Sequence, residues 1–334
     1  LSLRRQRQMC IRDRSPRYPR GWRGADRPTA GGDLERPLRR HGGALHGDPD
    51  DTGYDRRRTP EGTDRVSGRG GLNTLKHIDP QEFVDTLLPV VRQCAEASLI
   101  FFGKVSNIGK SIDPNLRSQE AREASSALTV LDTALQDIIL SAVLQHFSSV
   151  RCIAEEDTPL RRRFSGNWSE YVLILDPIDG TYHFQRGDAP YCVSVGLARN
   201  GFMEAALVAR PSEDKLFTAV RGKGSYLQIG RQRRRRLRLK ARPTTKSAYF
   251  STKARAYRPF AAPDLEPREF PIGAALVLTQ IAEGDLCAYL TRQVQVYDAG
   301  PPSLIAEEAG ARCFLHGGRT PNYDRKRKFG HYMC

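Results

Sequence analysis

The sequence predicts an α+β protein built from stacked layers of helices and sheets, and three observations carry this prediction. Apolar residues recur at helical spacing between residues 80 and 143. Short β-type runs separated by turn residues follow between residues 150 and 220. Helical and strand patterns then alternate after residue 272, with no internal repeat. Helices, then a run of strands, then mixed elements favour layered sheets over a simple doubly wound sheet.

Two helices are expected at the start of the folded part. Asp79 can cap the first helix, Pro80 suits its first turn, and Glu82 occupies the capping-box position. Its apolar stripe comprises Phe83, Leu87, Val91, Cys94 and Leu99, and Pro89 is expected to kink it. The stripe of the second helix comprises Leu128, Leu131, Leu135, Ile138, Ala142 and Val143.

The rest of the folded part is expected to be mainly a sheet followed by alternating elements. Strands are expected at residues 150–153, 171–175, 191–197, 205–208 and 216–220. Beyond them, the pattern predicts a buried helix at 272–282, a strand at 287–290 and another helix at 301–309.

The first 72 residues differ in composition from the remainder. They contain seventeen Arg, ten acidic residues and no Lys, with many Gly and Pro and no regular periodicity. Such a segment cannot bury enough apolar surface to offset chain entropy, so we expect a disordered Arg/Gly-rich tail over residues 1–72. A nucleic-acid-binding arm, a targeting peptide and sequence foreign to the natural protein are the three interpretations. No apolar signal core is present, and the acidic residues argue against a transit peptide. The segment Gln8-Met-Cys-Ile-Arg-Asp-Arg14 resembles translated sequencing-adapter DNA, and the Arg/Gly richness suits GC-rich DNA read in the wrong frame, so we favour a non-native tail.

We expect one catalytic domain over residues 73–334. The net charge and the cysteine content of the chain limit the classes of function that this domain can have. The tail carries a net charge of +7, which leaves +8 of the total +15 for the remainder, a balance that suits anionic substrates. The seven cysteines are scattered without a C-x-x-C pair, which argues against a disulfide framework or a zinc site. No apolar run is long enough to span a membrane, so we expect a cytoplasmic protein without a membrane partner.

The segment Asp176-Pro-Ile-Asp-Gly-Thr181 is the most informative motif. It follows the apolar run Tyr171–Leu175, so two carboxylates are expected together at the end of a buried strand. Gly180 allows a tight turn whose backbone N–H groups can face an anion. A magnesium-dependent phosphate-ester enzyme needs carboxylate oxygens that bind the metal beside backbone N–H groups that bind the phosphate.

Further motifs follow the same logic. Ala154-Glu-Glu-Asp-Thr-Pro159 lies upstream, and Val296-Tyr-Asp-Ala-Gly300 lies downstream. This order of motifs resembles the inositol monophosphatase family, within the lithium-sensitive, magnesium-dependent phosphatase superfamily. The resemblance extends over residues 76–334 and implies an αβαβα sandwich of the sugar-phosphatase type. It also implies a hydrolase that uses Mg²⁺. A homodimer is one possible assembly.

Site roles follow from the resemblance, position by position. It implies that Glu155, Asp176 and the carbonyl of Ile178 bind one magnesium ion, and that Asp176, Asp179 and Asp298 bind a second. It further implies that Thr181, with Glu155 and Asp132, orients the attacking water, and that Asp179, Gly180 and Thr181 contact the substrate. Glu156 is expected to tune the first ligand.

Simpler explanations exist for the same residues. Asp-Pro and Asp-Gly are common turn formers, Glu-Glu-Asp is often a solvated surface, and Asp132 could be a capping or surface residue. The basic run 231–242 could bind nucleic acid, but Leu237 and Leu239 alternate with charged residues as in an edge strand. No aromatic residue interleaves it, so we do not expect nucleic acid as a partner.

We therefore predict a magnesium-dependent phosphomonoesterase that hydrolyses a small sugar, inositol or related phosphate with metal-activated water. Thr291 and Arg292 stand where animal inositol monophosphatases have a glutamate, so the resemblance does not assign inositol itself. One alternative is a 3′(2′),5′-bisphosphate nucleotidase, which Glu155-Glu-Asp157 also resembles. The alternative from another class is a basic nucleic-acid-binding protein on an inactive phosphatase fold.

Overall fold

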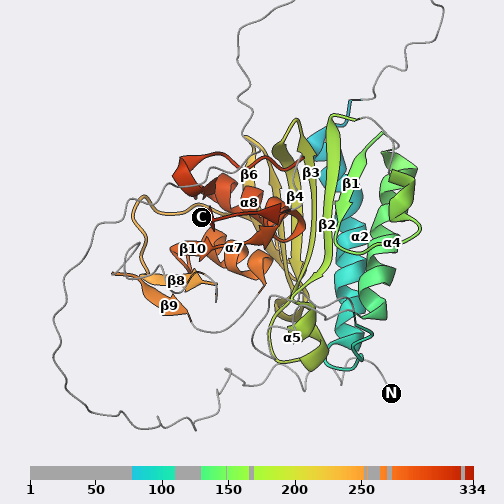
Figure 1. Ribbon diagram of the computed structural model, residues 1–334, viewed down its shortest axis with the longest axis horizontal. Coiled ribbons are helices and arrows are strands. Elements are labelled where there is room, and N and C mark those ends of the chain that lie inside the picture. Colours follow the sequence, from blue (N-terminus) through green and yellow to red (C-terminus); the bar gives the residue numbers. More distant parts are fainter. Residues whose placement is uncertain are drawn as a thin grey trace, which may run out of the picture. The chain divides into compact units, whose positions relative to one another are not determined.

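The computed structural model describes residues 77–109, 129–147, 149–164, 169–251, 254, 264–268, 273–324 and 328–334. The tail predicted over residues 1–72 lies outside these ranges and stays a prediction. Within them, helices and sheets alternate in layers: two helices, a large sheet, two more helices and a second sheet (Figure 1). The predicted α+β sandwich is thereby confirmed.

The large sheet has seven strands arranged in the order of the sequence. Strands β1 and β2 are parallel, and all later neighbours are antiparallel. The strands are β1 (Arg151–Ala154), β2 (Tyr171–Asp179), β3 (Cys192–Arg199), β4 (Phe202–Arg210), β5 (Lys215–Val220), β6 (Gly224–Ile229) and β7 (Arg235–Arg236). The five expected strands are present, and β6 and β7 extend the sheet beyond them.

Helices α2 (Pro80–Phe101) and α4 (Val130–His146) cover one face of this sheet (Figure 1). The side chain of Asp79 accepts a hydrogen bond from the amide of Gln81 at 2.8 Å, so the predicted cap is confirmed. Phe83, Leu87, Val91 and Cys94 are buried as predicted. The helix continues through Pro89.

Two residues of the predicted stripes are exposed instead. Leu99 is 41% exposed in the last turn of α2, and Ile138 is 52% exposed on α4. The buried face of α4 is formed by Leu135, Ile139 and Val143, with Leu140 beside them. Spacings of three and four residues both suit a helix, so the sequence pattern alone could not show that Ile139, rather than Ile138, faces the core.

Helices α7 (Ala274–Glu283) and α8 (Val296–Ala309) pack on the opposite face of the large sheet. A five-stranded sheet lies next to them, in the order β12 (Phe314–Leu315), β14 (Tyr332–Met333), β10 (Ala288–Thr291), β8 (Ser247–Phe250) and β9 (Glu266–Arg268). Strands β11 (Val294–Gln295) and β13 (Lys328–Phe329) form a separate pair. Short helical turns complete the described elements: η1 (Arg161–Phe164), α5 (Thr181–Arg186), η2 (Pro211–Glu213) and η4 (His316–Gly318).

The basic run occupies the edge of the large sheet. Strand β7 pairs only with β6 in the part of the chain that the structure describes, and its arginines are exposed. Leu237 is buried and Leu239 is partly buried against the core. The expected edge strand is therefore present only as the two residues of β7, and Leu237 and Leu239 follow it outside the strand. None of the described helices is long and apolar enough to cross a membrane.

A buried ion network links the large sheet to α7. Arg210, 2% exposed, forms ion pairs with Glu213 and Glu283, and Lys215 contacts both glutamates at 2.8 Å. We expect Arg210→Met to lower the free energy of unfolding by about 3 kcal/mol, because Glu283 stays buried with one cation fewer. The more exposed pair of Arg199 with Glu170 is the matched control, and Arg199→Met should cost at most about 1 kcal/mol. Urea unfolding measures both, and equal losses would contradict the prediction.

Candidate metal and phosphate site

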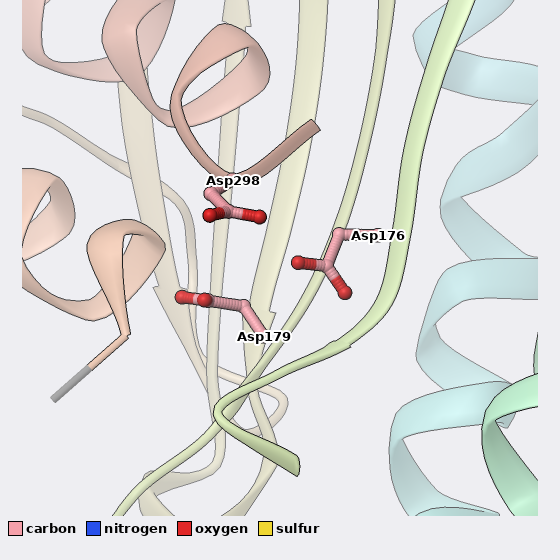
Figure 2. Close-up of side chains that lie close together, drawn as sticks. All are labelled: Asp176, Asp179 and Asp298. Atoms are coloured by element: carbon pink, nitrogen blue, oxygen red, sulfur yellow. The ribbon is translucent and has the colours of Figure 1, made fainter. Parts of the chain in front are cut away.

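Three aspartates converge at the interface between the large sheet and the helices α7 and α8. Asp176 and Asp179 come from the end of β2, and Asp298 comes from the first turn of α8 (Figure 2). One carboxylate oxygen from each lies within 4.8 Å of the others. Asp176 and Asp179 are buried, and Asp298 is partly buried.

Strand periodicity determines the direction of Asp176. Val172 and Ile174 belong to the core on the α7/α8 side, whereas Leu173 and Leu175 belong to the core under α2 and α4. Since side chains alternate between the two faces of a strand, Asp176 follows Val172 and Ile174 toward α8. The amide of Ile178 donates to Asp176 Oδ1 at 3.0 Å.

An irregularity in β2 brings the second carboxylate to the same place. The pairing of β2 with β3 shifts register between Asp176 and Asp179, which marks a bulge. Pro177 lies within it and has no N–H to donate to a ladder. The sequence pattern placed both carboxylates beyond the strand end, but β2 continues through Asp179. Bulges re-aim side chains, and this one directs Asp179 toward α7.

The start of α7 holds Asp179 in position. Asp179 Oδ2 accepts a hydrogen bond from the amide of Ala275 at 2.7 Å, and the amides of Ala274 and Leu276 also contribute. A helix N-terminus favours a carboxylate because its first N–H groups lack partners within the helix. Gly273 makes the approach possible, since a Cβ at this position would lie 2.3 Å from Asp179 Oδ2.

Glu155 reaches the same cluster from the end of β1. Its amide donates to the carbonyl of Leu175 at 3.1 Å, and its carboxyl group hydrogen-bonds Asp176. The neighbouring Glu156 is fixed by Gln136 of α4, whose side chain donates to the carbonyl of Glu156 at 2.8 Å and accepts from its amide at 3.0 Å. Gln136 is fully buried, so α4 positions the segment that carries Glu155.

The electrostatics of this cluster disfavour four free negative charges. The pKa of Asp176 lies well above its usual range because of burial and the charges of Glu155, Asp179 and Asp298. Burial raises the pKa of Asp179 to about 7, with a contribution from Glu155, although the α7 amides oppose the shift. Bound protons or cations would relieve this repulsion. The donors of the cluster are all oxygen atoms, which suit a hard divalent cation such as Mg²⁺.

Asp132 and Thr181 form a second polar group beside these carboxylates. Thr181 Oγ1 lies 3.0 Å from Asp132 Oδ1 and 2.9 Å from the carbonyl oxygen of Ile178. The other oxygen of Asp132 accepts from the amide and hydroxyl of Thr129, which caps α4. Burial raises the pKa of Asp132 to about 6, against the hydrogen bonds from Thr129 and Thr181. Asp132 is therefore a capping residue, and it also contacts Thr181.

Gly180 forms the turn between the strand and α5. Its backbone has φ 97° and ψ 34°, a left-handed conformation that suits glycine, as the sequence predicted. Thr181 begins α5 directly after this turn. The turn therefore places the backbone of Gly180 and Thr181 next to Asp179.

All the predicted site residues belong to one connected set: Asp132, Glu155, Asp176, Ile178, Asp179, Gly180, Thr181 and Asp298. Their individual roles stay predictions. The sequence assigned no role to three contributors, namely Gln136, Gly273 and the Ala275 amide. Gly273-Ala-Ala-Leu276 falls where members of the resembled family have a similar segment, but this resemblance did not indicate a contact with Asp179.

Gly273 provides a test of how closely Asp179 must approach α7. We expect Gly273→Ala to lower turnover by about tenfold or more and to weaken divalent-cation binding, because the new Cβ displaces the Asp179 carboxylate. Gly330→Ala is the matched control, since nothing lies within 4 Å of a Cβ there. Steady-state kinetics and a magnesium titration measure both variants. Unchanged kinetics in the Gly273→Ala variant would refute the packing argument.

Proteins with similar sequences and structures extend these observations. "Nus factor SuhB" from Pasteurella multocida is 26% identical over 215 residues, covering 60% of this chain and 76% of that protein. "Inositol monophosphatase 1" from Solanum lycopersicum is 38% identical over 100 residues, covering 30% of this chain and 36% of its relative. Among solved structures, Thermotoga maritima IMPase has a TM-score of 0.60 at 18% identity, covering 75% of this chain and 91% of that one. Mycobacterium tuberculosis SuhB has a TM-score of 0.56 at 23% identity, covering 77% and 91%.

These structural similarities support the fold, and the sequence match to a family extends across most of it. The model of the inositol monophosphatase family matches residues 88–329, a range that includes every predicted site residue. The expected resemblance is confirmed, and the chain belongs to the inositol monophosphatase family.

Proposed function

We propose that this protein is a magnesium-dependent phosphomonoesterase that hydrolyses the phosphate ester of a small sugar, cyclitol or nucleotide. Family membership supports a phosphatase. The observation that carries the proposal is the convergence of Asp176, Asp179 and Asp298, with the Glu155 carboxyl group beside Asp176. Structural ion networks also contain carboxylates, but they include cations as partners. Here the main contributors to the pKa shift of Asp176 are burial and other carboxylates.

The convergence of Asp176, Asp179 and Asp298 suits one hard cation, and the Glu155 carboxyl group beside Asp176 supports a second. Glu155, Asp176 and the Ile178 carbonyl would hold one ion, and Asp176, Asp179 and Asp298 would hold the other. When bound, the ions supply charge neutralisation for the phosphate and lower the pKa of a water molecule. The raised pKa values of Asp176 and Asp179 support this assignment, because bound cations would stabilise the ionised carboxylates that burial disfavours.

Asp132 and Thr181 would orient the attacking water. Thr181 donates its hydroxyl proton to Asp132 or to the carbonyl oxygen of Ile178, so its remaining lone pairs can accept from water. Ionised Asp132 makes this arrangement possible, and its pKa of about 6 keeps it mainly ionised above neutral pH. The amides of Gly180 and Thr181, next to the left-handed turn, would hold phosphate oxygens.

The proposal names only the class of alcohol that carries the phosphate, which is a small sugar, a cyclitol or a nucleotide. Thr291 is buried, and its hydroxyl donates to the carbonyl of Gln293, so it serves the local turn. Arg292 is exposed. The second candidate is a 3′(2′),5′-bisphosphate nucleotide, because Glu155-Glu-Asp157 also resembles the nucleotidase branch.

A nucleic-acid-binding role on an inactive fold is the alternative from another class. The exposed arginines of β7 favour it. In that case the wild-type protein would lack phosphatase activity, and salt-sensitive nucleic-acid binding would survive Asp179→Asn.

A phosphatase screen of the full chain tests the proposal. Sugar phosphates, inositol phosphates and 3′-phosphonucleotides are offered with millimolar Mg²⁺, and released phosphate is measured. We expect hydrolysis of at least one class, loss of activity after chelation, recovery with Mg²⁺ and inhibition by excess Ca²⁺, which tolerates other geometries. Activity that persists after exhaustive chelation would sink the metal assignment, and inactivity on every class would favour the nucleic-acid alternative.

Metal removal should also change how stability depends on pH. Asp132 and Asp179 have folded-state pKa values of about 6 and 7, above the value of about 3.9 expected for an unfolded chain. Raised carboxyl pKa values stabilise the folded state below the unfolded pKa, and this contribution is lost as pH rises through the folded pKa. We expect the urea midpoint of the metal-free protein to fall between pH 5 and pH 8. Mg²⁺ should raise the midpoint more at pH 8 than at pH 5.

Asp179→Asn serves as the control for this measurement, because it removes one of the carboxyl groups whose pKa is raised in the folded state. The fall in midpoint between pH 5 and pH 8 should become smaller in this variant. An identical pH profile in wild type and variant would show that Asp179 does not titrate in this range.

A further inference from the structure

Two cysteines far from the carboxylate site lie in direct contact. Cys313 lies between α8 and β12, and Cys334 directly follows β14. Their sulfur atoms are 2.7 Å apart, with the thiol of Cys313 donating to Cys334 Sγ. All six cysteines in the described residues are free thiols. The scattered positions of the cysteines in the sequence gave no indication of this pair.

The sheet register explains the contact. Strands β12 and β14 are antiparallel, with Phe314 opposite Met333 and Leu315 opposite Tyr332. One further step places Cys313 opposite Cys334. The pair is therefore a cross-strand neighbour pair rather than a chance contact between loops.

Hydrogen bonding identifies which type of cross-strand pair this is. Cys334 exchanges both backbone hydrogen bonds with Tyr289 of β10, at 2.8 and 3.0 Å. Its N–H and C=O therefore point away from β12, so Cys313 and Cys334 form a non-hydrogen-bonded pair. Opposed Cα atoms in such pairs are about 4.5 Å apart, within the range of about 4.4–6.8 Å that a disulfide spans.

We propose that Cys313 and Cys334 are a redox-active thiol pair that closes to an intramolecular disulfide when a small disulfide is the oxidant. One cysteine thiolate attacks oxidised glutathione, which forms a mixed disulfide and releases one glutathione thiolate. The second cysteine, as its thiolate, then attacks the mixed disulfide, forms the Cys313–Cys334 bond and releases the second glutathione. Two protein thiols are oxidised, and one glutathione disulfide is reduced to two thiols.

The consequence of closure is mechanical. The bond would fasten β14 to the segment that follows α8, where Tyr332 already hydrogen-bonds Ser303 of α8 through its hydroxyl. It closes the chain from residue 313 to residue 334 into a loop, which restricts the unfolded state. For a protein of this size, a disulfide that closes a loop of about 20 residues is expected to raise the melting temperature by about 5–10 °C.

The environment of the thiols predicts slow closure at neutral pH. Cys313 is 5% exposed. The hydrogen bond from Cys313, followed by burial, raises the pKa of Cys334 above the usual thiol value. Since the thiolate is the attacking species, the rate should increase as pH rises from 7 to 9.

The experiment uses the full chain, reduced and then incubated with oxidised glutathione at pH 8.5. Free thiols are counted after denaturation, disulfide-linked peptides are mapped by mass spectrometry, and melting temperature is recorded before and after reduction. We expect two of the seven thiols to be lost, one peptide pair containing Cys313 and Cys334, and a melting temperature that rises and returns on reduction.

Variants separate this pair from general cysteine oxidation. Cys152→Ser, at another partly buried cysteine, should retain the full response, whereas Cys313→Ser and Cys334→Ser should each lose the cross-link and the thermal shift. If a serine variant does not fold, peptide mapping of the wild-type protein still decides. Seven remaining thiols, a cross-link to a different cysteine, or a thermal shift that persists in a folded Cys313→Ser protein would overturn the proposal.

Discussion

Asp179→Asn is expected to lower kcat by about 10²-fold or more while leaving the metal-free protein as stable as wild type or more stable. Asparagine keeps an oxygen that can accept from the Ala275 amide, so the contact with α7 survives. It removes a buried negative charge that lies beside Asp176, Asp298 and Glu155. Relief of this repulsion favours the metal-free fold, whereas loss of a cation ligand removes a main electrostatic element of catalysis.

The measurement combines the melting temperature in chelator at pH 8 with kcat and a magnesium titration on the same variant. Asp85→Asn, at an exposed position on α2, is the matched control and should change neither quantity appreciably. If Asp179 only shaped the turn before Gly180, stability would fall by about 1 kcal/mol and turnover would be nearly retained. A destabilised but fully active variant would therefore sink the site assignment.

Local signals predicted the parts of the fold that depend on neighbouring residues. The cap at Asp79 and the strand at 171–175 both follow from residues within a few positions of one another. The predicted start of the last helix, at residue 301, was wrong. Pro301 and Pro302 suited a helix start, whereas α8 begins at Val296 and runs through both prolines. Interior prolines normally break helices, but both are buried in a helix that packs on the large sheet and α7, so tertiary packing overrides this preference.

This shift in α8 matters for the site. The expected helix at 301–309 left Asp298 outside it, but Asp298 lies in the first turn of α8. An acidic residue is favoured there because the helix N-terminus carries a partial positive charge. The rigid first turn therefore fixes the direction from which Asp298 approaches the two aspartates of β2.

The candidate site could be predicted from its linear motifs but not from the residues that hold them. Asp176 and Asp179 are three positions apart, and an apolar run in front of them already indicates a buried strand. The Ala275 amide, by contrast, lies 96 positions from Asp179, and Gln136 lies 20 positions from Glu156. No periodicity or composition reports such contacts, since they arise only when α7 and α4 pack on the sheet.

Thr181→Val should lower kcat by about 10²-fold while leaving magnesium affinity nearly unchanged, and Thr181→Ser should stay within about tenfold of wild type. Valine keeps the shape of threonine but removes the hydroxyl that lies 3.0 Å from Asp132 Oδ1. That oxygen of a fully buried carboxylate then loses its partner, so a stability loss of about 1–3 kcal/mol should accompany the loss of turnover. Serine restores the hydroxyl, and with it both effects should largely disappear.

Asp132→Asn distinguishes a role in the reaction from simple capping of α4. Asparagine keeps an oxygen that can accept from the amide of Thr129 in the capping box, so a capping role alone predicts a small stability change and full activity. If Asp132 acts on Thr181 as an ionised carboxylate, kcat should fall strongly, and the decline of activity toward acidic pH should lose the contribution of this group. Bound cations would lower the pKa of Asp132 below its metal-free value of about 6, so in wild type the midpoint of that decline should lie below pH 6. Turnover measured from pH 5 to 9 at saturating Mg²⁺, with Asp137→Asn as the control on the same helix, decides between the two roles. An Asp132→Asn protein with wild-type turnover across this range would leave the residue as a helix cap alone.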